Sequence, residues 1–331
     1  MDKLNLQCYN SFGVQATCTG IVHIYSEQDV YAFLPQDKTP YMILGGGSNI
    51  LFVNDYNGYI LRVEIKGIEV IDEDDESILV RVGAGENWHQ FVQWCVHHDL
   101  GGLENLSLIP GSVGAAPIQN IGAYGVEQNK CFHSLQYIDL EEGITKTVYK
   151  DDCMFGYRDS VFKHELKGKA IITRVYYLLK KHASPTISYA DVSNKLIEQN
   201  IMKPGVADVA EAVISIRSAK LPDPKKLGNA GSFFKNPVIS KLQFEGLALQ
   251  HQNIAHYPAG DHVKIAAAWL IDQCGFKGNR DGNTGSYKNQ ALVIVNFGGA
   301  TGKEIYDYAL KIQHSVKEKF GIKMEMEVNI I

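Results

Sequence analysis

The 331-residue sequence contains no long run of apolar side chains. A helix that crosses a membrane needs about 18 such residues in a row, and the longest apolar segments, Ala266–Ile271 and Ala291–Val295, are much shorter. Polar residues are mixed into the first twelve positions, which is not the pattern of a secretory leader. We therefore expect a cytoplasmic protein with no membrane partner.

A surplus of positive charge is also absent. Lys and Arg together number 32 and Asp and Glu number 37, which gives a formal net charge of −5. Nucleic-acid-binding proteins usually carry a basic surface, so no nucleic-acid partner is expected. A small anionic ligand could bind only where individual cations or backbone N–H groups receive it. Oligomeric state cannot be read from the sequence, and a monomer is the default expectation.

The usual metal and nucleotide motifs are missing. The six cysteines form no CxxC pair and the eleven histidines form no HExxH motif, so reduced thiols and no metal site are expected. Gly83-Ala84-Gly85 lacks the third glycine of a dinucleotide-binding turn. Gly298–Lys303 is one residue too short for a P-loop, and Glu304 replaces the Ser or Thr that would hold Mg²⁺. A Rossmann domain and a P-loop are both excluded.

At about 150 residues per domain, the length predicts two or three domains, and the pattern indicates three regions. The expected elements of the first two are a helix over 27–34 capped by Ser26, strands at 41–44 and 50–53, a hairpin of 68–71 with 78–82, a helix over 87–98 ended by Gly101-Gly102, strands at 135–140 and 170–179, and a helix near 208–218.

The third region follows a proline-marked linker, Lys220–Pro224. Asp261 is expected to cap a helix that runs to Cys274, with Gly275 just beyond its end. A buried strand is predicted at 291–296. Thr301 and Glu304 form a capping box for a helix that stops at Gly321. The tail, 324–331, alternates apolar and polar residues as a strand does.

Two glycine-rich loops are the strongest local signal. Gly45-Gly46-Gly47-Ser48-Asn49 lies between two predicted strands, and Ile109–Gly125 packs glycine, alanine and proline into a nearly uncharged segment. Backbone N–H groups in such loops can receive a pyrophosphate. The pair suggests a large phosphorylated cofactor, although two tight turns would give the same pattern.

Two further motifs look chemical. In Phe155–Ser160, Arg158 stands among Tyr, Asp and Ser and could hold a carboxylate by a bidentate fork; a structural Arg–Asp pair is the alternative. In Gly228–Pro237, Ser232 leaves a flexible loop and enters an apolar pair, where its hydroxyl could face a dry pocket. A serine in a turn is the alternative there.

Together these motifs resemble the family of UDP-N-acetylenolpyruvoylglucosamine reductases, FAD enzymes of bacterial peptidoglycan precursor synthesis. The resemblance runs nearly end to end, and Tyr189 is similar to the substrate-closing tyrosine of the type I branch. It rests on several motifs in the same order: Gly45–Asn49, Ile109–Gly114, Gln119–Gly125, Tyr157–Ser160, Gly228–Pro237 and Glu325–Val328.

The resemblance implies an α+β fold. Residues 1–67 and 68–218 would form two FAD-binding α/β subdomains of the vanillyl-alcohol-oxidase (PCMH-type) fold. Residues 219–321 would form an α+β substrate-binding domain, and the tail, 322–331, would return to the flavin region.

The resemblance also implies the chemistry. NADPH would reduce FAD, and hydride would pass from flavin N5 to the β-carbon of UDP-N-acetylglucosamine enolpyruvate, giving UDP-N-acetylmuramate. Arg158 would bind the carboxylate or enolate oxygen, and Glu327 would assist as a hydrogen-bond donor kept protonated by burial. Ser232 would deliver the proton to the α-carbon.

Further residues are assigned by the same resemblance. Tyr189, Lys220, Asn236 and Gln290 would bind the substrate. The cofactor-binding residues would be Gly45, Gly46, Gly47, Ser48, Asn49, Ile109, Pro110, Gly111, Ser112, Gly114, Ala115, Gln119, Asn120, Ile121, Gly122, Ala123, Tyr124 and Gly125.

Two departures and two alternative functions remain. The tail has Met326 and Asn329 where many family members have Pro and Arg, which leaves Glu325 as a rival to Glu327. Glu327 is preferred because the family's glutamate directly precedes Val or Ile. Another FAD oxidoreductase of the same fold would be reoxidised by air, and a non-catalytic nucleotide-sugar-binding protein would show no yellow flavin band.

Overall fold

The computed structural model describes residues 3–34 and 40–331. The chain forms two compact units. Unit 1 contains Cys18–Gly46 and Asn57–Arg217, and unit 2 contains Asn5–Thr17, Gly47–Tyr56 and Ser218–Ile331. The assignment of 1–67, 68–218 and 219–321 to separate domains stays a prediction.

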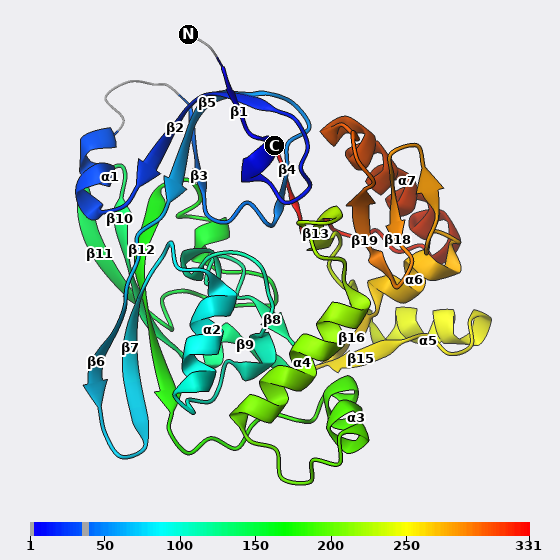
Figure 1. Ribbon diagram of the computed structural model, residues 1–331. Helices are drawn as coiled ribbons and strands as arrows, with labels where there is room; N and C mark the ends of the chain where they lie inside the picture. Colours follow the sequence, from blue (N-terminus) through cyan, green and yellow to red (C-terminus); the bar gives the residue numbers. More distant parts are fainter. Residues whose placement is uncertain (1–2, 35–39) are drawn as a thin grey trace. The chain divides into compact units, whose positions relative to one another are not determined.

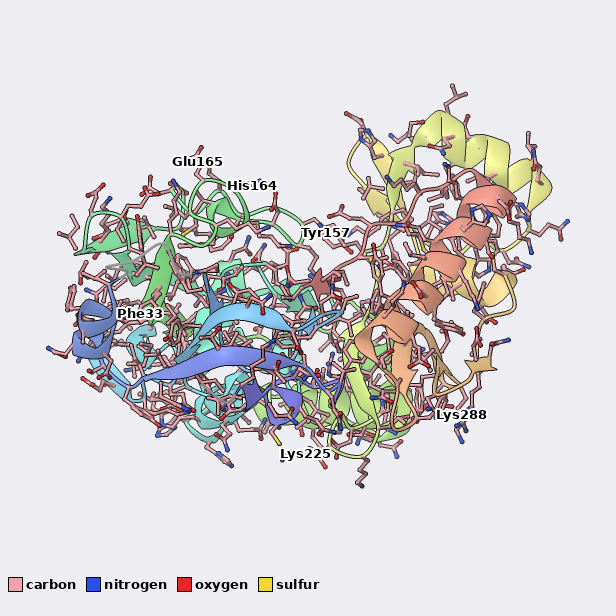
Figure 2. All side chains as sticks on the ribbon, turned by 90° about the horizontal axis from the view of Figure 1, so that it is seen from above. Phe33, Tyr157, His164, Glu165, Lys225 and Lys288 are labelled. Atoms are coloured by element: carbon pink, nitrogen blue, oxygen red, sulfur yellow. The ribbon has the colours of Figure 1, made fainter. Side chains whose placement is uncertain are left out.

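The first helix of unit 1 begins where the sequence predicts. In α1 (Glu27–Phe33), the Ser26 side chain accepts a hydrogen bond from the Asp29 N–H, and the Asp29 carboxylate accepts one from the Ser26 N–H. This reciprocal pair satisfies donors that a helix start would otherwise leave unpaired. Phe33, at the other end of α1, packs edge-on against Tyr41 and Tyr59, with ring centroids 5.9 and 6.3 Å apart (Figure 2). The helix is thereby fixed to β3 (Tyr41–Leu44) and β5 (Tyr56–Val63), which run parallel.

An antiparallel sheet of order β11-β10-β12-β7-β6 forms the centre of unit 1 (Figure 1). Its strands are β6 (Ile68–Glu73), β7 (Ser77–Gly83), β10 (Phe132–Asp139), β11 (Ile144–Tyr149) and β12 (Ala170–Lys180). The predicted hairpin and the strands predicted near 135 and 170 are therefore confirmed. The acidic run between β6 and β7 is exposed.

Helix α2 (Trp88–His97) is confirmed, and its apolar stripe is buried as the 3.6-residue period requires. Trp88 and Phe91 contact the Tyr177 ring of β12 at centroid distances of 5.9 and 5.3 Å. The predicted stop at Gly101-Gly102 is wrong. Asp99 has a φ of 54°, and the Leu100 N–H bonds to the Cys95 carbonyl. Aspartate tolerates this left-handed conformation better than most residues, so Asp99 takes the terminating position, and the helix ends at His97, close to the predicted end at 98.

A smaller helical layer completes unit 1. Helix α4 (Val206–Lys220), predicted near 208–218, packs against α3 (Ala190–Glu198). Val192 and Leu196 of α3 bury their side chains against Val209, Ala212 and Val213 of α4. This cluster is separate from the core that surrounds Trp88.

Unit 2 contains a sheet of order β13-β19-β18-β17 with α6 and α7 beside it (Figure 1). The elements are β13 (Gly228–Ser232), α6 (Ala267–Gln273), β17 (Arg280–Asp281), β18 (Thr284–Tyr287), β19 (Gln290–Asn296) and α7 (Gly302–Phe320). The Thr301–Glu304 capping box is formed, and Gly321 ends α7 with a φ of 66°. The strand predicted at 291–296 is confirmed as β19.

The helix predicted to begin at Asp261 is wrong. Asp261 lies in the turn of a hairpin between β15 (His256–Ala259) and β16 (His262–Ile265), which also pairs with β14 (Val238–Ser240). Val263 and Ile265 are buried on either side of Lys264, which is the two-residue period of a strand. Helix α6 starts later, at Ala267, whose N–H donates to Asn236 Oδ1 at 2.9 Å. Gly275 lies beyond its end with a φ of 78°.

The tail pairs with the segment after the first glycine loop. β20 (Asn329–Ile330) runs parallel to β4 (Ile50–Leu51), and both strands are shorter than the sequence indicates. The remaining strands are β1 (Leu4–Asn5), β2 (Thr17–Ile24), β8 (Gly122–Ala123) and β9 (Val126–Glu127), and the remaining helix is α5 (Lys241–Gln250). Short 3₁₀ turns lie at Gln7–Tyr9, Glu104–Leu106, Val113–Ala115, Gln128–Lys130 and Val161–Lys163. Antiparallel sheets combined with helices confirm the α+β class, and no helix within 3–34 and 40–331 has the length and apolarity of a membrane span.

Two glycine-to-alanine substitutions should have opposite effects on stability. A Cβ at Gly302 would lie 1.7 Å from the Phe52 carbonyl oxygen, so Gly302→Ala should lower the free energy of unfolding by about 1–3 kcal/mol. Gly246, in the exposed helix α5, has open space around it, so Gly246→Ala should raise that free energy by about 0.5–1 kcal/mol. Denaturant unfolding measures both, and a stabilised Gly302→Ala variant would contradict the packing described here.

Candidate active site

Gly45 and Gly46 of the first glycine loop adjoin the second loop within unit 1. A Cβ added to Gly45 would lie 2.5 Å from Ser112 Oγ, and one added to Gly46 would lie 3.0 Å from the Gly111 Cα. Gly114 is similarly close to Ala84, with 2.6 Å to its Cβ. Glycine is needed here because backbone packs directly against neighbouring atoms. The loops that the sequence singles out are therefore assembled side by side.

Two half-buried side chains, His89 and Arg217, hold the entrance to the second loop. Leu108, just before it, has a φ of 57°; its N–H donates to His89 Nδ1 at 3.0 Å and its carbonyl accepts from Arg217 Nε at 3.3 Å. Burial, with a smaller contribution from the charge of Arg217, lowers the pKa of His89, which suits a neutral imidazole acceptor. Burial also lowers the pKa of Arg217, although the charge of Tyr124 and a hydrogen bond with Tyr124 act in the opposite direction.

Arg158 lies in a tight turn. The Gly156 N–H donates to the Asp159 carbonyl at 3.1 Å, and the Asp159 N–H donates to the Gly156 carbonyl at 3.3 Å. Arg158 has a φ of 56°, and its Nη2 donates to the Gly122 carbonyl of the second glycine loop at 2.7 Å. Its guanidinium carbon is 5.4 Å from the Tyr157 ring centroid.

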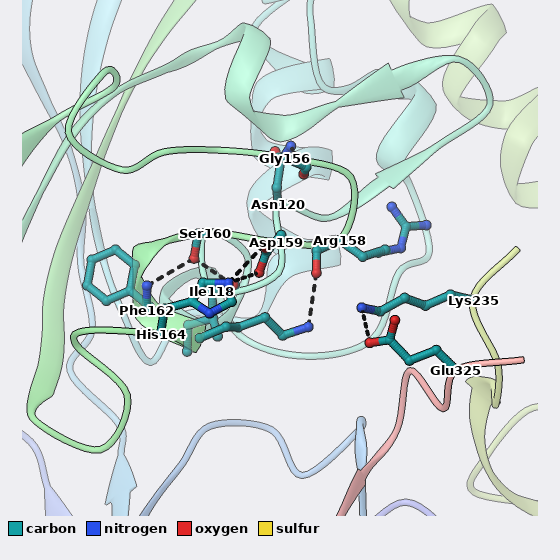
Figure 3. Close-up of polar contacts among 11 residues, drawn as sticks. Ile118, Asn120, Gly156, Arg158, Asp159, Ser160, Phe162, His164, Lys235 and Glu325 are labelled. Atoms are coloured by element: carbon teal, nitrogen blue, oxygen red, sulfur yellow. Dashed lines mark hydrogen bonds and ion pairs between the residues drawn. The ribbon is translucent and has the colours of Figure 1, made fainter. Parts of the chain in front are cut away.

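Two further side chains attach this turn to the second loop (Figure 3). Asn120 Nδ2 donates to the Gly156 carbonyl at 3.1 Å, and Ser160 Oγ donates to the Ile118 carbonyl at 2.7 Å. Asn120 is 0% and Ser160 is 1% exposed. The structure therefore brings the predicted catalytic arginine together with predicted cofactor-binding residues.

The neighbouring aspartate pairs with a histidine. Both Asp159 carboxylate oxygens lie 2.9 Å from His164 Nε2. Burial raises the pKa of the Asp159 carboxyl, but the His164 hydrogen bond and the charges of His164 and Lys163 outweigh burial, and the pKa is lowered. Figure 2 shows Tyr157 and His164 on the same loop segment.

Tyr189 packs on the far end of the second loop. Its ring meets the Tyr124 ring edge-on at 5.3 Å. Asn105, 0% exposed, donates from Nδ2 to the carbonyls of Tyr124 and Thr186, at 3.1 and 2.9 Å. Asn105 therefore fixes both the loop and the segment that leads to Tyr189. Residues such as Asn105 were not predicted, because nothing in their local sequence marks them.

Ser232 ends β13 at an irregular point of the strand. Gly231 has a φ of 70°, and the pairing with β19 shifts between Asn229 and Ser232. Ser232 is exposed, whereas the following Phe233 and Phe234 are buried. Of the two alternatives, the structure does not place Ser232 in a dry pocket, because the two rings enter the core and Ser232 stays exposed.

The tail brings Glu327 next to Ser232 in unit 2. The Glu327 N–H donates to the Phe233 carbonyl at 2.8 Å, and Met326 is bridged to Phe234. Glu327 is half-buried. Glu325 differs, because its side chain is 70% exposed and ion-paired with Lys235 (Figure 3).

The first glycine loop also contacts the tail. A Cβ at Gly47 would lie 2.0 Å from the Tyr9 carbonyl oxygen. Asn49 Nδ2 donates to the Glu327 carbonyl at 3.2 Å, and the Asn49 carbonyl accepts from the N–H and the Nδ2 of Asn329 at 3.0 and 2.9 Å. Asn329 therefore holds the first glycine loop to the tail through two hydrogen bonds to the Asn49 carbonyl.

The other predicted substrate residues lie in unit 2. Asn236 uses its Oδ1 to receive the Ala267 N–H at the start of α6. Asn289 Nδ2 donates to the Ala219 carbonyl at 3.0 Å. Lys220 directly follows Ala219 in the chain, and Gln290 directly follows Asn289. Gln290 begins β19.

Two family models match the chain. One described as an FAD binding domain covers residues 23–148, which include both glycine loops. One described as the C-terminal domain of UDP-N-acetylenolpyruvoylglucosamine reductase covers 223–331. Glycine loops in which backbone replaces side chain fit a large cofactor held through main-chain N–H groups.

Similar proteins are aligned over almost their whole length. A protein of Flavobacterium johnsoniae named UDP-N-acetylenolpyruvoylglucosamine reductase is 46% identical over 99% of this chain and 98% of its own. One of Azoarcus sp. with the same name is 47% identical over 96% and 94%. The crystal structure of the Thermus caldophilus reductase has the same fold, with a TM-score of 0.68, 24% identity and coverage of 99% and 98%. The chain therefore belongs to the UDP-N-acetylenolpyruvoylglucosamine reductase family of FAD-containing oxidoreductases.

Proposed function

We propose residue roles for the NADPH-dependent reduction of UDP-N-acetylglucosamine enolpyruvate to UDP-N-acetylmuramate, a step of peptidoglycan precursor synthesis. FAD held by the two glycine loops would supply the hydride chemistry, from NADPH by way of flavin N5 to the β-carbon of the enolpyruvyl group. The observation that carries the proposal is the attachment of the Arg158 turn to the second glycine loop through Asn120, Arg158 and Ser160. A cation held against a cofactor loop is what a reaction that develops negative charge requires.

The glycine loops are proposed to hold the cofactor. Gly45, Gly46 and Gly111 bring main-chain segments into direct contact, so neutral N–H groups can meet a pyrophosphate without a nearby cation. An acidic chain can bind a dianion in this way because the donors are fixed dipoles. Cations are then required only outside these loops, as proposed for Arg158 at the carboxylate and for Lys220 at the UDP moiety.

Arg158 is proposed to bind the substrate carboxylate. Arginine has five N–H donors in a planar fork, and the bond from Nη2 to the Gly122 carbonyl holds that fork beside the second glycine loop. The planar fork matches a carboxylate, which gains negative charge as hydride reaches the β-carbon. Because the fork is held before substrate arrives, little reorganisation is needed in the transition state.

Ser232 is proposed to donate a proton to the α-carbon, with Glu327 beside it. Ser232 is exposed at the end of β13. The hydrogen bond from the Glu327 N–H to the Phe233 carbonyl brings Glu327 beside the residue that follows Ser232. A hydroxyl is a weak acid, but a carbanion-like carbon is a strong base. The exposed ion pair of Glu325 with Lys235 supports Glu327 over Glu325 for this role.

Tyr189, Lys220, Asn236 and Gln290 are proposed to hold the UDP moiety. Asn236 already accepts a hydrogen bond through Oδ1, so its amide N–H groups are the ones suited to a diphosphate oxygen. Tyr189 packs edge-on against Tyr124 of the second glycine loop, which would link substrate binding to the flavin region. We expect a monomer in the cytoplasm that acts on this small molecule.

Ser232→Ala should separate the two half-reactions. Hydride transfer from NADPH does not need a protein proton donor, so the rate at which NADPH bleaches the flavin should stay within twofold of the wild-type value. Reoxidation by the enolpyruvyl substrate should slow by about 10²-fold or more, the usual loss when a general acid is removed. Stopped-flow absorbance measures both rates, and unchanged reoxidation would remove Ser232 as the donor.

Gly46→Val should weaken FAD binding by about tenfold. A Cβ at position 46 would lie 3.0 Å from the Gly111 Cα, so the methyl groups of valine would displace Gly111. A loss of about 1.4 kcal/mol of binding free energy corresponds to a tenfold weaker affinity. Flavin fluorescence titration of apoprotein gives the affinity. Gly246→Ala, in open space on α5, is the control and should bind FAD as the wild type does. Equal affinity in the two variants would argue against the glycine loops as the cofactor site.

A further inference from the structure

Arg158 occupies a turn position at which an arginine is unusual. It is the third residue of the Gly156–Asp159 turn and has a φ of 56°. A positive φ at this position is typical of type II turns, in which glycine or asparagine is preferred. A non-glycine residue held in this conformation persists only where its surroundings impose it, and such residues concentrate at functional sites.

The hydrogen bonds described above fix the two ends of the turn. Asn120 holds the Gly156 carbonyl, and Ser160 is tied to Ile118. Neither bond reaches the peptide group between Arg158 and Asp159, whose N–H donates to the Gly156 carbonyl at 3.3 Å within the turn. Its carbonyl accepts a hydrogen bond from Lys163 Nζ at 2.9 Å.

Lys163 is well placed to hold that carbonyl. It ends a 3₁₀ turn, Val161–Lys163, whose first two side chains are 7% and 6% exposed. Ser160 caps this turn by accepting from the Phe162 N–H at 3.3 Å. The backbone that carries Lys163 is therefore anchored in the core of unit 1, and only the ammonium group reaches out to Arg158.

We propose that Lys163 is a positioning residue that keeps Arg158 in the left-handed conformation from which its guanidinium receives the substrate carboxylate. The proposal rests on the role proposed above for Arg158. In the left-handed conformation the Cβ leaves the backbone in a different direction from that in a helix or strand. A charged donor on the Arg158 carbonyl makes a stronger hydrogen bond than a neutral one and opposes rotation of the peptide group.

The test uses the FAD-loaded full-length enzyme with Lys163→Met. Flavin reduction by NADPH should stay within twofold of the wild-type rate, while the KM for the enolpyruvyl substrate should rise about tenfold and reoxidation should slow. Lys163→Arg retains a charged donor and should recover most of the loss. Lys167→Met is the matched control, because Lys167 is an exposed lysine on the same segment, and it should match the wild type.

A double-mutant cycle separates positioning from general structural damage. In an Arg158→Gln background, Lys163→Met should add less than a twofold effect, because Lys163 acts only through Arg158. Multiplicative effects would overturn the inference. The flavin absorption band and Tm of each variant show that it is folded, and Lys163→Gln replaces Lys163→Met if the latter does not hold FAD.

The remaining outcomes distinguish the two proposals. Full activity of Lys163→Met together with a defective Arg158→Gln overturns the role of Lys163 and leaves that of Arg158. Full activity of Arg158→Gln overturns the proposed role of Arg158, and the inference falls with it. If Lys163→Arg shows the same defect as Lys163→Met, the hydrogen-bonded positioning role of Lys163 is also overturned.

Discussion

The second glycine loop has to be held in a defined shape although little of it is helix or strand. Side-chain donors that reach backbone carbonyls meet this constraint: Asn105 bonds to Tyr124, Arg158 to Gly122 and Ser160 to Ile118. A buried carbonyl without a donor costs free energy, so each of these bonds both satisfies a polar group and fixes a position. The second glycine loop, the Gly156–Asp159 turn and the segment that leads to Tyr189 all depend on this set of contacts.

The sequence predicts the regular elements well because their signals are local. The capping boxes at Ser26 and Thr301 and the apolar stripe of α2 involve residues three or four apart. Errors arise where a second signal competes. Asp99 takes the left-handed position before Gly101 is reached, and alternation around Lys264 makes a strand of the segment after Asp261.

The site is predicted only in part. Motifs identify Arg158, Ser232 and the glycine loops, since each stands in an unusual local composition. The residues that orient them are different. Asn105 bonds to a carbonyl 81 residues away, and the bonds from Arg158 and Ser160 to the second glycine loop span 36 and 42 residues, which no local pattern encodes. The exposure of Ser232 likewise depends on the direction taken by Phe233 and Phe234, not on their apolar character.

Unit 2 is assembled from three segments that are separated in the sequence: Asn5–Thr17, Gly47–Tyr56 and Ser218–Ile331. Asn49, in the first glycine loop, is tied to Glu327 and Asn329. Since a ribosome makes the chain from its N-terminus, the segments of unit 1 emerge before these tail partners exist, and domains fold as their chains become available. The first glycine loop therefore gains these hydrogen bonds only after Glu327 and Asn329 have been made, so a chain that stops before Glu327 would form the loop without them.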